Sequence, residues 1–323
     1  MDETNNAIRI ALADSQRILL MTHERPDGDA IGSLMGLGLA LREAGKQVQM
    51  VIIDGVQRTF RHLQGAELVE KAITPGWDLS MVVDCSDMHR TGDLLPDQDV
   101  GINIDHHITN LNFAKINLVN PKAAATAEII TENLESWGLN FSQPVANALL
   151  TGIISDTIGF RTSNVHPQTL RLAALLMEQG ADLPELYNQA LVRRSFEAAR
   201  LWGIGLNRMQ RQGRMVWTSI SLDERRSVSY PGKDDADLTN ILSAIEDTDI
   251  AVIFLEKEDQ RVKISWRAQP GIDVSNLAVH YGGGGHPAAA GAEINGAMEE
   301  VIPLVLQATE QLINSNNHAN SLH

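Results

Sequence analysis

The first half of the chain alternates short apolar runs with longer amphipathic stretches. Residues 17–22 form an apolar run that predicts a buried strand ending at His23. Residues 29–44 predict a helix, with Asp29 as the expected N-cap and Gly45 as the terminating residue. Further strands are predicted at 47–53, 79–83 and 100–104, and helices at roughly 123–137, 143–158, 167–180 and 195–211. This alternation predicts an α/β fold with a doubly wound, mainly parallel sheet.

A second, smaller α/β pattern starts near residue 215. It predicts strands at 215–221, 250–255, 261–267 and 290–294, and helices near 235–246, 274–281 and 298–314. The turn at residues 258–260 predicts a hairpin between two of these strands. We therefore expect a bilobal chain with a first domain at 1–190, a helical connector at 191–212, a second domain at 213–316 and a disordered tail at 317–323.

Composition and charge narrow the class of partner. The 323 residues carry 26 basic and 41 acidic side chains, for a net charge of −15. Proteins that follow long nucleic acids usually carry a basic stripe, and none is visible, so we expect a short anionic substrate and no long duplex. The only cysteine is Cys85, and no apolar run approaches the roughly 20 residues that span a bilayer. These features predict a cytoplasmic protein that does not enter a membrane.

Metal-binding residue types follow three predicted strands of the first half. His23, Asp84 and Asp105 each come directly after a strand, and the carboxyl ends of parallel strands share one edge of the sheet. Imidazole and carboxylate ligands suit Mn²⁺ or Mg²⁺ better than structural zinc. Two ions ~3.5–4 Å apart can stabilise the attacking and leaving oxygens of an in-line displacement. A two-metal phosphoesterase is therefore predicted from the series His23, Asp27, Asp29, Asp84, Asp105, His106, His107 and Asp156.

Each member of this series also has a purely structural explanation. Asp27 could form only a turn, Asp29 could only cap a helix, and His106 could be a core histidine with satisfied hydrogen bonds. Asp156 is harder to explain in this way, because it interrupts an apolar helix and an unpaired buried carboxylate is costly. Cys85 has no basic neighbour in sequence, which favours packing over nucleophilic catalysis.

A glycine run in the second half is the next candidate for chemistry. Residues 281–287 read Tyr-Gly-Gly-Gly-Gly-His-Pro, and the structural alternative is a flexible linker. The run lies between a predicted helix and an alanine-rich segment, and glycines allow backbone N–H groups to surround an anion. Arg267, at the end of a predicted strand, is a candidate for a bidentate phosphate contact.

Five sequence blocks resemble those of the DHH phosphoesterase family. They are HERPDGDAIGS (23–33), VVDCSD (82–87), IDHH (104–107), TGIISDT (151–157) and DVSNLAVHYGGGGHPAAAG (273–291). The last block is similar to the DHH-associated domain, although Pro287 stands where the family commonly has a lysine or another polar residue. The resemblance implies a bilobal fold with the active site in the cleft.

The resemblance also implies roles for individual residues. His23, Asp27 and Asp84 would bind one metal ion. The second ion would be bound by Asp29, Asp84, His106 and Asp156, so that Asp84 bridges the pair. Asp105 would orient a histidine, and His107 would contact the phosphate or help to protonate the leaving group. Substrate contacts are implied for Arg267, Gly283, Gly284, Gly285 and His286, and Arg90 and Thr126 also fall in stretches that resemble family blocks.

Within the family, the compact size resembles the bifunctional oligoribonuclease and pAp phosphatase group. Such enzymes hydrolyse short oligoribonucleotides (nanoRNA) to mononucleotides and 3′-phosphoadenosine 5′-phosphate (pAp) to AMP. The alternatives are a phosphodiesterase of cyclic or linear dinucleotides such as c-di-AMP and pApA, and a short single-strand exonuclease of RecJ type. The resemblance implies two divalent ions, Mn²⁺ first and Mg²⁺ or Co²⁺ as substitutes, and a homodimer is expected.

Overall fold

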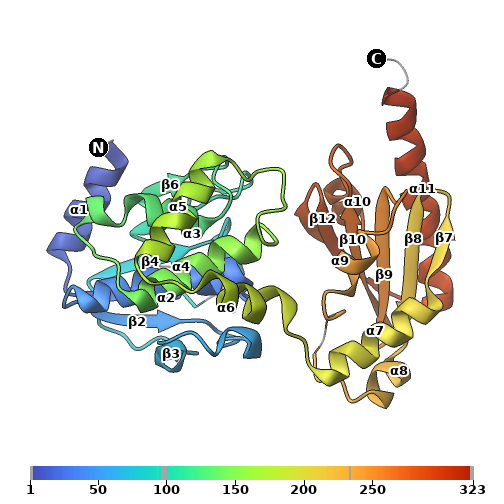
Figure 1. Ribbon diagram of the computed structural model, residues 1–323, viewed down its shortest axis with the longest axis horizontal. Coiled ribbons are helices and arrows are strands. Elements are labelled where there is room, and N and C mark those ends of the chain that lie inside the picture. The colour runs from blue at the N-terminus through green and yellow to red at the C-terminus, as the bar shows by residue number, and fades with distance from the viewer. Residues whose placement is uncertain (1–2, 93, 96–99, 233, 321–323) are drawn as a thin grey trace. The chain divides into compact units, whose positions relative to one another are not determined.

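The chain divides into two compact units. The computed structural model describes residues 3–92, 94–95, 100–232 and 234–320, and the units are Met1–Arg193 and Arg194–His323 (Figure 1). The helix expected to connect two domains, α7 (Phe196–Arg208), packs within the second unit through Ala198 and Leu201. Each unit has its own sheet and its own hydrophobic core.

The first unit is built on a six-stranded sheet in the order β3-β2-β1-β4-β5-β6. Every neighbouring pair is parallel, which confirms the predicted parallel sheet. The order of the strands reverses between β1 and β4. The strands are β1 (Arg17–Met21), β2 (Gln47–Val51), β3 (Val69–Glu70), β4 (Leu79–Val83), β5 (Ile102–Asp105) and β6 (Ile116–Val119).

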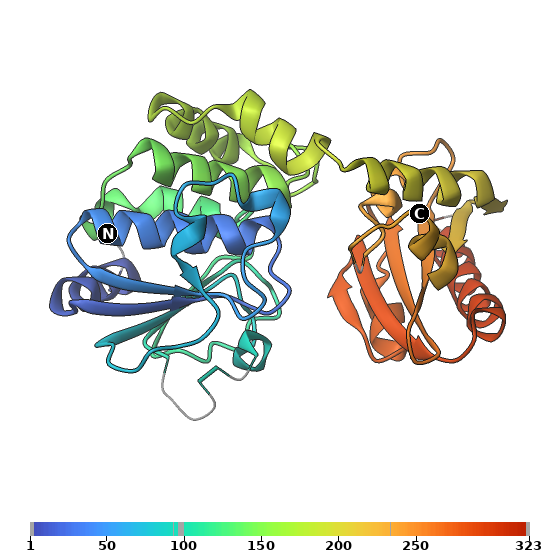
Figure 2. The same ribbon diagram turned by 90° about the horizontal axis from the view of Figure 1, so that it is seen from below.

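Alternate strand residues of the first sheet face two separate cores. Ile18 and Leu20 pack against helices, whereas Leu19 and Met21 pack on the opposite face with loop residues such as Trp77. Figure 2 shows α2 and α4 side by side over the helical face. The helices are α1 (Glu3–Asp14), α2 (Gly28–Glu43), α3 (Thr126–Asn133), α4 (Gln143–Asp156), α5 (Pro167–Glu178) and α6 (Leu183–Tyr187), with the short turns η1 (Arg58–Phe60), η2 (Ala66–Leu68), η3 (Met88–Thr91), η4 (Glu135–Trp137) and η5 (Asn188–Val192).

Two glycines allow α2 and α4 to approach at backbone distance. A Cβ atom on Gly32 would lie 2.5 Å from the carbonyl oxygen of Ala148, and one on Gly152 would lie 2.9 Å from Oδ1 of Asp29. Any larger side chain at these positions would push the helices apart. The close approach therefore sets where α2 presents Asp29 and where α4 presents Asp156, its last residue.

The second unit has a mixed six-stranded sheet in the order β11-β12-β10-β9-β8-β7. Only β8 and β9 are parallel, and β9 and β10 form the predicted hairpin. Residues of α7 and α9 pack on one face, and residues of α10 and α11 pack on the other. The elements are β7 (Gln210–Gln212), β8 (Met215–Ile220), α8 (Leu222–Ser227), α9 (Leu238–Leu242), β9 (Ile250–Lys257), β10 (Arg261–Ala268), α10 (Ser275–His280), β11 (Gly284–His286), β12 (Ala289–Asn295) and α11 (Met298–Asn320).

Several elements differ from the sequence expectation. The helix expected at 235–246 is reduced to α9, because Ala236 and Asp237 have positive φ angles of 53° and 64°. The tail expected from residue 317 overlaps the end of α11, and residues 321–323 lie outside the described part. Helix α1 and strand β6 were not predicted. In the described part of the chain, no helix is long and apolar enough to cross a membrane.

Candidate metal centre and nucleotide site

The carboxyl edge of the first sheet gathers side chains from three strands. His23 lies two residues after β1, Asp84 follows β4 directly, and Asp105 is the last residue of β5. Ligands of open α/β sheets bind at this edge, where the order of the strands reverses. The reversal lies between β1 and β4, so His23 and Asp84 occupy the position where a ligand is expected.

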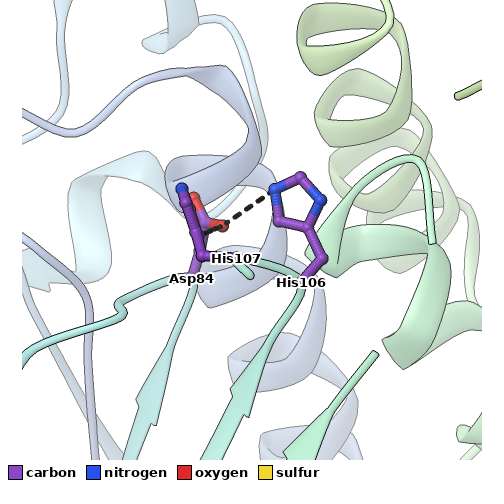
Figure 3. Close-up of side chains that lie close together, drawn as sticks. All are labelled: Asp84, His106 and His107. Carbon is purple, nitrogen blue, oxygen red and sulfur yellow. Dashed lines mark ion pairs between the residues drawn. The ribbon is translucent and has the colours of Figure 1, made fainter. Parts of the chain in front are cut away.

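Asp84 lies at the centre of this edge. It is 1% exposed, and its φ of 53° is in the left-handed region that few residues other than glycine adopt. Its Oδ2 lies 3.7 Å from Nε2 of His23, and its Oδ1 lies 3.8 Å from Nε2 of His106. Figure 3 shows the ring of His106 directed at this carboxylate. The two oxygens of Asp84 therefore face different histidines.

The start of α2 contributes two aspartates with different roles. Asp27 is the N-cap, because its Oδ1 accepts hydrogen bonds from the N–H groups of Asp29 and Ala30, both at 3.0 Å. The expectation that Asp29 caps this helix is therefore wrong. Asp29 instead accepts from the N–H groups of Thr126 at 2.6 Å and Ala127 at 3.0 Å. These are the first N–H groups of α3, which have no partner within their own helix.

Two histidines present the same ring nitrogen to the carboxylates. Nδ1 of His23 lies 2.7 Å from the carbonyl oxygen of Glu24, and Nδ1 of His106 lies 3.3 Å from that of Ala123. A carbonyl oxygen can only accept, so each Nδ1 carries a hydrogen and each Nε2 is the nitrogen that faces the carboxylates. Nε2 of His106 lies 3.5 Å from Asp156 and 4.0 Å from Asp29. Such a ring is ready to bind a cation through Nε2.

The ligand-type side chains form three groups, in each of which the candidate ligand atoms lie within 4.8 Å of one another. Asp84 belongs to two of the groups and His106 to two. Seven of the eight residues of the predicted series belong to these groups, and the exception is Asp105. The groups are His23, Asp27 and Asp84; Asp84, His106 and His107; and Asp29, His106 and Asp156.

The electrostatics of these groups favour a bound cation. Burial, together with the negative charges of Asp84 and Asp156, raises the pKa of Asp29 well above its usual range. Burial, together with Asp27 and Asp84, likewise raises the pKa of Asp156. Burial also acts to raise the pKa of Asp84, but the hydrogen bond to His23 and the nearby histidines outweigh it and lower that pKa. Positive charge among these carboxylates would relieve the repulsion.

Asp105 orients His107 rather than joining the ligand groups. Its Oδ1 lies 2.7 Å from Nδ1 of His107, and its carboxylate also accepts from the N–H of His106 at 2.9 Å and from Nδ2 of Asn110 at 2.5 Å. Burial alone would lower the pKa of His107, but this hydrogen bond and the charge of Asp84 raise it to about 9. Arg90, which is exposed, lies close enough to oppose that rise.

The second unit holds a polar pocket of about 210 Å³ around Arg267. Arg267 donates from Nε to Oδ1 of Asn240 at 2.9 Å, and burial lowers the pKa of its guanidinium. The glycine run is partly a strand: Gly284 pairs with Gly291 in β12, and a Cβ on Gly283 would lie 2.1 Å from the carbonyl oxygen of Gly291. The side chain of His286 lies outside the described part. The pocket is lined by Asp235, Asp237, Thr239, Asn240, Ser265, Arg267, Ala290 and Gly291.

Sequence comparison matches a separate family model within each unit. Residues 17–153 match the DHH family, N-terminal domain, and residues 228–315 match the DHHA1 domain. A protein of Thermus thermophilus named bifunctional oligoribonuclease and PAP phosphatase NrnA is 34% identical, over 91% of this chain and 89% of its own length. The chain belongs to the DHH family. A Bacillus subtilis protein of the same name is 28% identical, over 88% of this chain and 91% of its own.

A solved structure supports the DHH-family fold of both units. The crystal structure of an exopolyphosphatase-related protein from Bacteroides fragilis has a TM-score of 0.88 at 23% identity. The similarity covers 97% of this chain and 96% of that one. A similarity at 23% identity shows the fold, whereas the chemistry depends on the individual side chains.

The side chains of this DHH-family member fit divalent metal ions. The donors are carboxylate oxygens and imidazole nitrogens, which suit such ions. In His23 and His106, Nδ1 faces a backbone carbonyl oxygen, an arrangement usual for metal-bound imidazoles. Asp29, which is 1% exposed, is a buried carboxylate with a raised pKa, and a cation would offset its burial.

Sequence reasoning missed several residues around the ligands. Asn110 and the N–H groups of Thr126 and Ala127 hold Asp105 and Asp29, and the Thr126 hydroxyl donates to Oδ1 of Asp84 at 2.9 Å. Nothing in their local pattern marked these contacts, although Thr126 fell in a block that resembles the family. Burial raises the pKa of Cys85 to about 12, which agrees with a packing role for that thiol.

Proposed function

We propose that this DHH-family chain hydrolyses short oligoribonucleotides to mononucleotides and pAp to AMP, with two divalent ions and Mn²⁺ as the preferred metal. The observation that carries the proposal is the position of Asp84, whose two carboxylate oxygens face His23 on one side and His106 on the other. A carboxylate that bridges two ions needs this arrangement. The names of the Thermus thermophilus and Bacillus subtilis relatives support the choice of substrates.

The proposed ligand sets follow the groups of side chains. His23, Asp27 and Asp84 would hold one ion, and their ligand atoms lie within 4.8 Å of one another. The other ion would be held by Asp29, Asp84, His106 and Asp156. The backbone N–H groups of α3 that bind Asp29 and the hydroxyl that binds Asp84 would keep both carboxylates fixed.

In the proposed reaction, water attacks phosphorus and the bond from phosphorus to the 3′ oxygen breaks. Bound divalent ions supply Lewis-acid activation of the water and neutralise charge on the phosphate. His107 would contact the phosphate and give a proton to the leaving oxygen, because Asp105 holds its ring and keeps it protonated. Arg90, close to His107, would contribute a further positive charge on the substrate side.

The second unit would bind the nucleotide itself. We assign phosphate binding to Arg267, whose guanidinium lines the polar pocket and is oriented by Asn240. Backbone groups of Gly283, Gly284 and Gly285 and the side chain of His286 would complete the contact. A pocket for one nucleotide favours short substrates. The net charge of −15 points the same way, because it is unfavourable for binding along a long polyanion.

The test is a substrate panel with the purified full chain and Mn²⁺. Labelled RNA of two, five and 24 nucleotides, pAp, pApA and c-di-AMP are compared by kcat/KM, and Mg²⁺ and Co²⁺ are substituted for Mn²⁺. We expect the two- and five-nucleotide RNAs and pAp to be hydrolysed much faster than the 24-nucleotide RNA. Equal rates for the 24-nucleotide and two-nucleotide RNAs would contradict a short-substrate enzyme. A preference for pApA or c-di-AMP over pAp would identify a dinucleotide phosphodiesterase instead.

We also propose that the protein is a cytoplasmic homodimer. Two-fold assemblies are the commonest among homo-oligomers, and a lone reduced cysteine suits a reducing compartment. Light scattering coupled to gel filtration gives the mass directly, and a value near 35.3 kDa, the mass of one chain, would exclude the dimer.

A further inference from the structure

The peptide group that joins Ala123 to Ala124 lies between His106 and a buried glutamate. Its carbonyl oxygen, which belongs to Ala123, lies 3.3 Å from Nδ1 of His106. Its N–H, which belongs to Ala124, donates to Oε2 of Glu128 at 3.1 Å. A trans peptide group is planar, and its C=O and N–H point in opposite directions. A hydrogen bond that fixes the N–H therefore also fixes the direction of the C=O.

We propose that Glu128 is a positioning residue that sets metal affinity by holding His106 through this peptide group. The inference rests on the proposed function only in that His106 binds a metal ion. In the described part of the chain, Glu128 makes no hydrogen bond or ion pair with a candidate ligand, so its effect passes through the backbone. Nothing in the sequence pattern distinguished it from Glu132, the other glutamate of α3.

Glu128 is itself firmly held. Its side chain is 4% exposed, and its Oε2 also accepts from the hydroxyl of Thr169 at 2.9 Å. Its Oε1 lies 3.4 Å from Nε2 of His166, whose Nδ1 accepts from the N–H of Thr169 at 3.3 Å. The Thr169 hydroxyl also lies 2.6 Å from this Nδ1, so His166, Thr169 and Glu128 form one hydrogen-bonded group. Residues at the start of α5 thus contact both oxygens of Glu128, and two hydrogen bonds hold its Oε2 beside the peptide.

The rest of the segment is equally constrained. Ala123 and Ala124 are 3% and 0% exposed, the N–H of Ala123 donates to the carbonyl oxygen of Asn120 at 3.0 Å, and Nδ2 of Asn164 lies 3.4 Å from the carbonyl oxygen of Ala124. The same segment continues into the N–H groups of Thr126 and Ala127 that bind Asp29. Its position therefore determines the placement of two candidate ligands on different elements.

The negative charge of Glu128 should strengthen the hydrogen bond between the Ala123 carbonyl oxygen and His106. An anionic acceptor polarises the peptide group, which makes the carbonyl oxygen a stronger acceptor for Nδ1–H. That hydrogen bond keeps the tautomer in which Nε2 of His106 presents its lone pair to Asp29, Asp84 and Asp156, at 3.5–4.0 Å. Partners one layer behind a metal ligand typically change metal affinity or activity by about 10–100-fold when they are removed.

The experiment measures Mn²⁺ binding to the full chain by the electron paramagnetic resonance signal of the free ion. Glu128→Ala is expected to weaken binding by about 10–100-fold. Glu128→Gln keeps an oxygen acceptor and loses the charge, and we expect a smaller but measurable weakening of about three-fold or more. The matched control is Glu132→Gln, the same change one turn later on the exposed side of α3, which should bind Mn²⁺ as the wild type does. At saturating Mn²⁺, KM for pAp should be unchanged in Glu128→Gln.

A double-mutant cycle tests whether the effect passes through His106. In a His106→Ala background, Glu128→Ala should weaken Mn²⁺ binding much less than in the wild type, because the main residue that it positions is gone and only the contact of the segment with Asp29 is left. Fully additive effects of the two substitutions would overturn the proposal. If Glu128→Ala does not fold, Glu128→Gln decides, and Mn²⁺ binding as tight as that of the wild type would then overturn the proposal. If the wild type binds Mn²⁺ but hydrolyses none of the substrate panel, the proposed function fails and this inference is judged on Mn²⁺ binding alone.

Discussion

His23 and Asp84 follow the two neighbouring strands between which the order of the parallel sheet reverses, and Nε2 of His23 lies 3.7 Å from Oδ2 of Asp84. The pair depends on an unusual backbone, since Asp84 has a φ of 53°. Strained backbone of this kind costs of order 1–3 kcal/mol and persists where the surroundings determine it fully. Here the N–H of Asp84 donates to the carbonyl oxygen of Ile104 at 2.9 Å, which anchors the turn.

Replacing Asp84 with asparagine should separate chemistry from folding. Asparagine tolerates a positive φ, so Asp84→Asn should keep a Tm close to that of the wild type in EDTA. Loss of the Asp84 charge should reduce kcat for pAp on the order of 10³-fold and remove most of the Mn²⁺ affinity, if Asp84 bridges the two ions as proposed. Asp87→Asn, which keeps the cap of η3, is the matched control. Hydrolysis by Asp84→Asn at a rate near that of the wild type would exclude the two-metal assignment.

The Asp105–His107 hydrogen bond predicts a pH-dependent contribution to the free energy of unfolding when EDTA has removed any metal ion. The pKa of folded His107 is raised from 6.5 to about 9 by Asp105 and Asp84, against the effect of burial. The contribution is fully present below pH 6.5 and is lost as the pH rises through about 9. Asp105→Asn should therefore lower the free energy of unfolding by roughly 1–3 kcal/mol near pH 6.

That difference should shrink as the pH approaches 10. Thermal unfolding of both proteins in EDTA between pH 6 and pH 10 measures it, and Asp87→Asn again serves as the control. A difference between wild type and Asp105→Asn that stays constant over this range would show that the hydrogen bond does not depend on a charged His107.

Gly152 is expected to be a sensitive packing position beside the ligands. A Cβ there would lie 2.6 Å from Cβ of Ala127 and 2.9 Å from Oδ1 of Asp29. Gly152→Ala should lower the free energy of unfolding by about 1–3 kcal/mol through overpacking and should weaken Mn²⁺ binding by displacing Asp29. Gly203→Ala, in α7 with no atom within 4 Å of the added Cβ, should instead be neutral or slightly stabilising. Equal Tm changes in the two variants would contradict this reading.

Arg267 should affect substrate binding without affecting the metal. Arg267→Ala removes a charged hydrogen-bond donor, a loss of about 1.5–3 kcal/mol, so KM for pAp should rise by about 10–100-fold. The Mn²⁺ titration should be the same as for the wild type. Arg261→Ala, on the same strand and paired with Glu293 at 3.2 Å, should leave KM unchanged. An unchanged KM in Arg267→Ala would remove this residue from the proposed nucleotide site.

The sequence by itself determined the parallel sheet of the first unit and the positions of its strand-end ligands. Apolar runs of strand length separated by helical patterns require crossovers, and crossovers between parallel strands bring all carboxyl ends to one edge. His23, Asp84 and Asp105 were therefore predictable as neighbours before any contact was known. The hairpin of β9 and β10 was equally visible, because its turn is local.

The tertiary structure alone decided which partner each of these side chains has. Asp29 looked like the cap of its own helix, but it binds the first N–H groups of α3, almost a hundred positions later in the chain. Helix α1 was not predicted, because its buried face consists of only Asn5, Ile8 and Leu12. Glu128 reaches His106 through one peptide group. Periodicity records which face of an element is buried, whereas hydrogen-bond partners depend on how closely helices such as α2 and α4 pack, and that distance is set by contacts between distant residues.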